Sequence, residues 1–171
     1  YYDIAYDTSK KGKFKHWYST DKRHSSITIG NYCLKPGKTY YFKVRAVNGN
    51  KVGKWSAVKS AKSVLATPTM YDIDLKSENS AYIDFDSNNS TNCFKGYELY
   101  RSTSKNSGYK KIATCKPNKS EYTNKGLADG KVYYYKVRAY TKVSGKTVYS
   151  KFSPVKSIVV PKKVEINMGN W

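Results

Sequence analysis

The sequence predicts an all-β fold made of two consecutive copies of one β-sandwich plan. Apolar and polar residues alternate with a period of two, as in residues 97–101 and 133–139, and this period is typical of strands with one buried face. Tyr, Val, Ile and Thr fill such segments, whereas Gly, Asn, Asp, Ser and Pro separate them about every ten residues. Regularly spaced short strands of this kind favour a sandwich, and no segment has the spacing of an amphipathic helix.

An internal repeat divides the chain. Three pairs of segments match in the same order, namely 2–10 with 97–105, 34–46 with 127–139, and 55–60 with 152–157. The spacing between them differs only by short loop changes, which indicates a tandem duplication. We therefore expect one domain at 1–66, a second at 67–160, and a linker or the start of a further module at 161–171.

Strands can be placed in the second copy from the alternation and the turn residues. The expected strands are at about 69–75, 80–86, 95–102, 109–115, 120–124, 132–141 and 147–159. Hairpin turns are expected at Asn48-Gly49 in the first copy and at Ser144-Gly145 in the second, because these pairs suit two-residue loops.

The first copy starts at the counterpart of strand 95–102, so we expect it to lack the first two strands of the plan. The inward side chains of Ile4, Tyr40, Phe42 and Val44 would then have no cover. At about 25 cal/mol per Å² of apolar surface, this loss is large beside a domain stability of about 5–15 kcal/mol. We expect an upstream continuation, or strands from another chain, to complete this copy.

One motif of the first copy resembles the fibronectin type III family. It reads Leu34-x-Pro36-Gly37-x-x-Tyr40-x-x-x-Val44-x-Ala46-x-Asn48, and the second copy keeps Leu127, Gly130, Tyr133, Val137 and Ala139. Asp129 and Thr141 stand where the first copy has Pro36 and Asn48. The resemblance covers nearly the whole chain and implies that Tyr40 and Tyr133 are tyrosine corners, whose hydroxyls bond back to the preceding loop. The Lys-rich loops are similar to modules of Gram-positive bacterial proteins that are secreted or attached to the cell surface.

The net charge of +20 comes from 32 Lys and Arg against 12 Asp and Glu, and nearly all of the cations are Lys. Specific recognition of bases and phosphates relies on bidentate hydrogen bonds from Arg. Because nearly all of the cations are Lys, we expect no specific nucleic-acid binding. Attraction to anionic polymers is compatible with this charge. No apolar stretch approaches the length of a membrane span, and the first residues lack the features of a signal peptide.

No set of residues indicates catalysis, and we expect no cofactor or metal. The two histidines, His16 and His24, have no partner set for a triad or a metal site. Residues 84–89 offer oxygen ligands, but they lack the glycine turn and the closing Glu of a calcium loop. Cys33, Cys93 and Cys115 form no framework, and whether Cys93 pairs with Cys115 stays open.

The outward face of the long strand in each copy is the candidate binding surface. Its residues are Tyr41, Lys43 and Arg45 in the first copy and Tyr134, Lys136 and Arg138, with Tyr100 beside them, in the second. Such a face could stack sugars or hold an anionic polymer. The competing interpretation is cross-strand pairing inside the module, with Tyr rings covering Lys stems and Glu98 opposite a cation.

These observations favour a non-catalytic spacer or interaction pair in an extracellular protein, secreted or on the cell surface. One alternative is a binding module for polysaccharide, an anionic wall polymer or a host protein. Another is a pair of accessory domains of an extracellular hydrolase whose catalytic domain lies outside residues 1–171.

Overall fold

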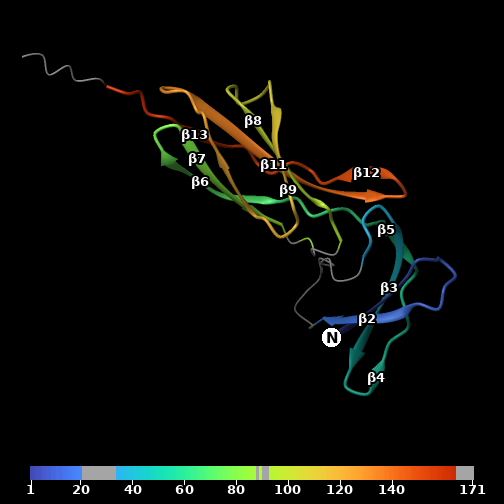
Figure 1. Ribbon diagram of the computed structural model, residues 1–171. Helices are drawn as coiled ribbons and strands as arrows, with labels where there is room; N and C mark the ends of the chain where they lie inside the picture. The colour runs from blue at the N-terminus through green and yellow to red at the C-terminus, as the bar shows by residue number, and fades with distance from the viewer. Residues whose placement is uncertain (21–33, 88, 90–92, 165–171) are drawn as a thin grey trace, which may run out of the picture. The chain divides into compact units, whose positions relative to one another are not determined.

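The strands pair with one another in the antiparallel sense, as short connections between neighbouring strands require. The structure is a computed structural model that describes residues 1–20, 34–87, 89 and 93–164 (Figure 1). These residues form strands and turns without a helix, so the prediction of an all-β fold is confirmed. In the same residues there is accordingly no helix long and apolar enough to cross a membrane. The chain divides into unit 1, Tyr1–Val64, and unit 2, Leu65–Trp171.

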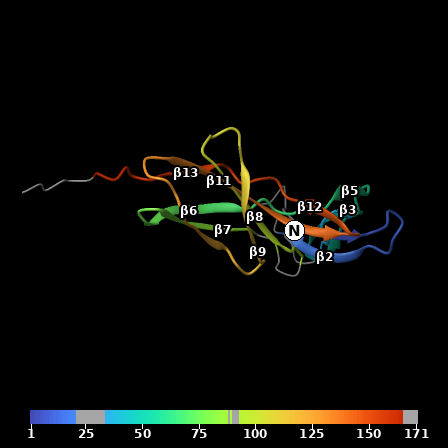
Figure 2. The ribbon, with the colours of Figure 1, turned by 45° about the horizontal axis from the view of Figure 1, so that its top comes forward.

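Unit 2 is a sandwich of two sheets. Its strands are β6 (Thr69–Ser77), β7 (Ser80–Asp86), β8 (Gly96–Ser102), β9 (Lys110–Cys115), β10 (Glu121–Asn124), β11 (Val132–Val143), β12 (Lys146–Tyr149) and β13 (Lys156–Val159). The smaller sheet has the order β10-β7-β6, and the larger has the order β12-β11-β8-β9 with β13 also paired to β11. Figures 1 and 2 show β6 and β7 running side by side as one hairpin.

The core of unit 2 lies between the two sheets. Alternate residues of β11 are buried, namely Tyr133, Tyr135, Val137 and Ala139, so one face of this strand is shielded from solvent. Phe85 and Ile83 of the β6–β7 hairpin pack against this face and are fully buried. Burial of several such side chains, each about 1.5–3 kcal/mol, holds the two sheets together.

Unit 1 contains one sheet among its described residues. Its strands are β1 (Tyr2–Asp7), β2 (Lys15–Thr20), β3 (Thr39–Asn48), β4 (Lys51–Val52) and β5 (Lys59–Lys62), in the order β2-β1-β3-β4 with β5 also paired to β3. This sheet corresponds to the larger sheet of unit 2, as the sequence repeat requires. Among the described side chains of its strands, the buried apolar residues are Ile4, Ala5, Tyr40 and Val47. The expectation that Ile4 and Tyr40 lack cover is therefore wrong for these two residues, and the Tyr6 ring lies against Tyr40 with centroids 6.0 Å apart. Val44 is 42% exposed, as that expectation requires.

Two hairpin turns have positive φ angles, which only certain residues adopt easily. Ser144 and Gly145 form the loop between β11 and β12 with φ of 49° and 79°, which is the turn that matches the twist of a hairpin. In unit 1, Asn48 pairs with Lys51, so the hairpin loop is Gly49-Asn50 and lies one residue later than expected. Gly49 supplies a φ of 57° there.

The strand expected at 147–159 is interrupted, and it forms β12 and β13 instead. Between them, serine side chains replace backbone carbonyls as acceptors. The Ala139 amide donates to Ser150 Oγ at 2.9 Å, and the Val137 amide donates to Ser153 Oγ at 3.1 Å. Pro154 follows directly and has no amide hydrogen for a ladder bond. The segment therefore stays attached to β11 without regular pairing.

Candidate functional site

The outward face of β11 brings the candidate residues of unit 2 together. Lys136 lies directly across from Tyr100 of β8, and Arg138 lies directly across from Glu98. Side chains opposite one another on antiparallel strands share a face. This face therefore carries a carboxylate, two cations and a phenol side by side.

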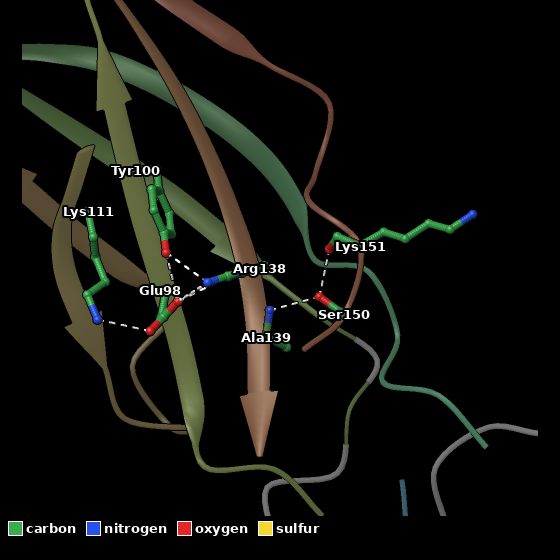
Figure 3. A network of polar contacts seen from close by, with 7 residues as sticks. All are labelled: Glu98, Tyr100, Lys111, Arg138, Ala139, Ser150 and Lys151. Atoms are coloured by element: carbon green, nitrogen blue, oxygen red, sulfur yellow. Dashed lines mark hydrogen bonds and ion pairs between the residues drawn. The ribbon is translucent and has the colours of Figure 1, made fainter. Parts of the chain in front are cut away.

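Glu98 is the acceptor at the centre of this face (Figure 3). Arg138 donates to its Oε2 from Nη2 at 2.8 Å and from Nε at 3.0 Å. Lys111 of β9 donates to Oε1 at 3.0 Å, and the Tyr100 hydroxyl donates to Oε2 at 3.0 Å. Burial acts to raise the pKa of Glu98, but these hydrogen bonds from Lys111, Arg138 and Tyr100 prevail and hold the pKa below its usual value.

Aromatic rings enclose the two cations of β11. The Arg138 guanidinium lies 3.6 Å from the ring centroid of Tyr149 and 4.9 Å from that of Phe152. The Lys136 ammonium lies 4.4 Å from the centroid of Phe152 and 4.0 Å from that of Tyr109. The order Tyr149, Arg138, Phe152, Lys136, Tyr109 thus alternates ring and cation, and we call it the outer ladder of unit 2. Each contact of this kind stabilises by about 0.5–2 kcal/mol.

Unit 1 has an equivalent outer ladder, formed by Phe14, Lys43, Trp55 and Arg45. The Lys43 ammonium lies 4.7 Å from the centroid of Phe14 and 4.8 Å from a ring of Trp55, and Arg45 lies 4.4 Å from Trp55. Arg45 donates from Nε to Oδ2 of Asp3 at 3.0 Å, as Arg138 does to Glu98.

The two ladders occupy matching positions of the sequence repeat. Asp3 corresponds to Glu98, Phe14 to Tyr109, and Trp55 to Phe152. The ladder of unit 2 has one further member, Tyr149, because Val52 stands at that position in unit 1. Beside the ladder, unit 2 also has Tyr100 where unit 1 has Ala5. The duplication has therefore retained one contact scheme with different aromatic residues.

Sequence reasoning placed the cations on this face but missed the rings that enclose them. Phe14, Trp55, Tyr109, Tyr149 and Phe152 come from other strands and loops of each unit. The available signal was the repeat itself, which aligns an aromatic residue at 14 with one at 109 and another at 55 with one at 152.

Two tyrosines of the candidate face are not members of the ladders. Tyr41 and Tyr134 are half-buried at the next outward position of β3 and β11. Burial raises the pKa of Tyr109, and the charge of ionised Tyr134 nearby raises it further. Tyr134 therefore lies close to the Tyr109 end of the outer ladder.

Tyr40 and Tyr133 bond back to the loops that precede their strands. The Lys35 amide donates to the Tyr40 hydroxyl at 2.8 Å, and the Ala128 amide donates to the Tyr133 hydroxyl at 2.9 Å. Both tyrosines are buried, so each hydroxyl satisfies a loop amide next to the core.

The structure describes some of the acidic, histidine and cysteine residues that the sequence singled out as metal or disulfide candidates. Asp86 accepts hydrogen bonds from the Tyr97 hydroxyl and from the Ser87 amide. Across the described residues, no group of three or more His, Cys, Asp and Glu is placed to hold a metal ion. Cys115 is a buried free thiol whose pKa is raised by burial, so the bridge to Cys93 left open by the sequence is not formed. His24 and Cys33 lie outside the described residues.

Comparisons with known proteins support the fold. No family model matches the sequence. Interference hedgehog of Drosophila ananassae is 27% identical over an alignment of 179 residues, which covers 91% of this chain and 20% of that protein. The chain thus spans about a fifth of the length of the curated relative that it matches.

Two solved structures are similar to this chain. The solution structure of the 6th fibronectin type III domain from human fibronectin type III domain containing protein 3 has a TM-score of 0.52 and 22% identity. The match covers 64% of this chain and 97% of that one. The crystal structure of the chicken CNTN1 FN1–FN3 domains has a TM-score of 0.45 and 17% identity, with 94% of this chain and 54% of that chain covered. The described elements are all strands, and the match with a TM-score of 0.52 shows a fold of the fibronectin type III kind.

Proposed function

We propose that the chain is a non-catalytic spacer and interaction pair of an extracellular protein. The observation that carries this proposal is the outer ladder, which recurs in both units and directs the polar side chains of the face toward their own unit. Fibronectin type III-like architecture supports an extracellular setting, and the Lys-rich loops support a secreted or surface protein of Gram-positive bacteria.

The geometry of the ladder leaves its arginines little capacity for a ligand. The Arg138 side chain is 21% exposed and the Glu98 side chain 9%, while the corresponding values for Arg45 and Asp3 are 30% and 9%. Each guanidinium is bound to a carboxylate and lies against at least one aromatic ring. A ligand would have to displace these contacts, so the arrangement favours a structural use of the arginines, one that stiffens each module.

A matched pair of variants tests the spacer proposal. Arg138→Gln and Lys142→Gln each remove one positive charge from β11, but only Arg138 belongs to the ladder. We expect Arg138→Gln to lower the unfolding midpoint in urea, and we expect both variants to bind lipoteichoic acid equally. If folded Arg138→Gln loses tenfold more affinity than Lys142→Gln, the face is a ligand site and the spacer proposal is wrong.

Binding of an anionic polymer is the second candidate function, and a separate observation favours it. The charge is +20, yet in the described part of the chain Lys111 and Lys163 are the lysines that form ion pairs with carboxylates. Lys43 and Lys136 lie in the ladders and Lys156 binds a backbone carbonyl, but the other described lysines are available to neutralise a polyanion. Teichoic acid of a bacterial wall is a polymer of this class.

A salt titration tests the second candidate. If lysines bind the polymer through its charges, affinity for teichoic acid should fall steeply between about 50 and 200 mM salt, because bound counterions are released. A neutral polysaccharide of similar length is the control and should show no retention. Absence of retention on teichoic acid at low salt would dismiss this candidate and leave the spacer proposal untouched.

A further inference from the structure

Unit 1 presents a second face, opposite its outer ladder. Tyr2 lies across from Ala46, Ile4 from Val44 and Tyr6 from Phe42 in the pairing of β1 with β3. Directly opposed residues share a face of the sheet. We call the surface formed by Tyr2, Ile4, Tyr40, Phe42 and Val44 the inner face of unit 1. Apart from the polar tip of its tyrosines, this face is apolar.

Part of this face is more exposed than the matching residues of unit 2. Val44 is 42% exposed, while its counterpart Val137 in unit 2 is fully buried at 0%. Tyr2 is 41% exposed, and its counterpart Tyr97 is 1% exposed. Tyr2 and Val44 are therefore open in unit 1, although their counterparts are covered in unit 2, while Ile4 and Tyr40 of the same face are buried.

A groove runs along the same face. It has a volume of about 260 Å³ and is lined by Leu34, Tyr40, Phe42, Ala61, Lys62 and Val64, with Ser63 between the last two. Val64 is 73% exposed. Exposed apolar side chains that lie together in a groove indicate an interaction surface.

Unit 2 shows what kind of polypeptide covers such a face. The β6–β7 hairpin places Phe85 edge-on against Tyr97, with ring centroids 5.1 Å apart. Ile83 and Met70 of the same hairpin are buried in the core that also contains Val137. Alternating large apolar residues on two antiparallel strands thus meet the inner face of the larger sheet.

A polar contact completes this covering. The Lys156 ammonium donates a hydrogen bond to the backbone carbonyl of Tyr71, which lies on β6. Lys59 occupies the same position in unit 1, where it pairs with Phe42 on β5–β3 and is exposed. Unit 1 therefore has both the apolar surface and the lysine that unit 2 uses to hold its hairpin.

We propose that the inner face of unit 1 binds a two-stranded antiparallel β-hairpin whose one side carries large apolar residues at alternating positions. Such a hairpin buries its apolar side on Tyr2, Phe42 and Val44 and offers a backbone carbonyl to Lys59. Two sheets packed face to face about 10 Å apart then enclose a core, as in unit 2.

The probe for this proposal is a synthetic peptide with the sequence of residues 67–87, joined end to end so that the hairpin is formed before binding. The full chain is titrated with the peptide, and binding is measured by calorimetry. We expect saturable binding to one site per chain. A peptide carrying Ile83→Asp and Phe85→Asp should bind at least tenfold more weakly, because two charges would enter the core.

Variants of the chain locate the site. Val44→Asp should reduce the affinity at least tenfold, and the free chain should remain folded because Val44 is already exposed. Val52→Asp is the matched control, since Val52 is 54% exposed on β4 and is not part of the inner face. The proposal is overturned by absence of binding, by binding that Val44→Asp leaves unchanged, or by a Val44-dependent dimer of the chain that the peptide does not dissociate.

Discussion

Arg138 places two nitrogens, Nη2 and Nε, on one carboxylate oxygen of Glu98, at 2.8 and 3.0 Å. The pairing joins β11 to β8 on the outer face, away from the core. Lys111 and Tyr100 also donate hydrogen bonds to the Glu98 carboxylate, so this carboxylate links three strands of the larger sheet (Figure 3). In unit 1, Asp3 joins β1 to β3 through Arg45 in the same way.

Replacing Glu98 with Gln should destabilise unit 2. The amide keeps the shape of the side chain but removes the charge that compensates Arg138 and Lys111. We expect a loss of about 1–3 kcal/mol, the usual cost of leaving buried polar groups without their partner. Urea unfolding of Glu98→Gln measures it. Glu121→Gln is the control, because Glu121 is exposed and its loss should change stability by less than about 0.5 kcal/mol.

The contribution of Glu98 to the free energy of unfolding should depend on pH. Its folded pKa lies below the ordinary value of 4.5, so the folded state binds fewer protons than the unfolded state in that range. The stability from Glu98 is therefore present above pH 4.5 and is lost as the pH falls through the lower folded pKa. The stability difference between the wild-type chain and Glu98→Gln should shrink on acidification. A difference that grows at pH 3 would contradict this assignment.

Tyr135→Phe should leave unit 2 as stable or stabilise it by up to about 1 kcal/mol. The Tyr135 hydroxyl is buried and has no hydrogen-bond partner among the described residues, so its removal ends a desolvation cost. Unit 1 has Phe42 at the same position of the repeat. Thermal unfolding of Tyr135→Phe measures the effect, with Tyr133→Phe as the contrasting variant.

Burial raises the pKa of Tyr135 and of Tyr97 to about 12. The unfolded chain releases these protons near the ordinary value of 10.0, whereas the folded chain retains them. Stability from this source is present below pH 10 and is lost as the pH rises toward about 12. Ultraviolet titration should show that Tyr97 and Tyr135 ionise at this alkaline end, and Tyr135→Phe should reduce the absorbance change there by one tyrosine.

Tyr133→Phe should destabilise unit 2 by about 1–2 kcal/mol, because the Ala128 amide would lose its acceptor. Tyr40→Phe should act in the same way on unit 1 through the Lys35 amide. Tyr134→Phe is the control, since that tyrosine points to the outer face. Equal stability of Tyr133→Phe and Tyr134→Phe in urea would show that the loop bond contributes nothing.

Much of the fold follows from local pattern. A period of two places β7 at 80–86 as expected and β11 at 132–143, close to the expected 132–141, because alternation and turn residues act over a few neighbouring positions. The alternation in the sequence does not predict the split of the last strand into β12 and β13. Ser150 and Ser153 are compatible with a strand in sequence, and only the nearby β11 amides make their hydroxyls into acceptors.

The primary structure alone establishes the alternating strands, the duplication and the side of β11 on which Lys136 and Arg138 lie, because each depends on residues close together or on a copied order. The assembly in space decided which rings enclose those cations and which carboxylate binds Arg138. Tyr109, Tyr149 and Phe152 reach the same surface only through sheet pairing and the path of the segment after β12. Contacts between such distant positions leave no periodic trace in the amino-acid order, since they depend on the register of strands that only the folded core selects.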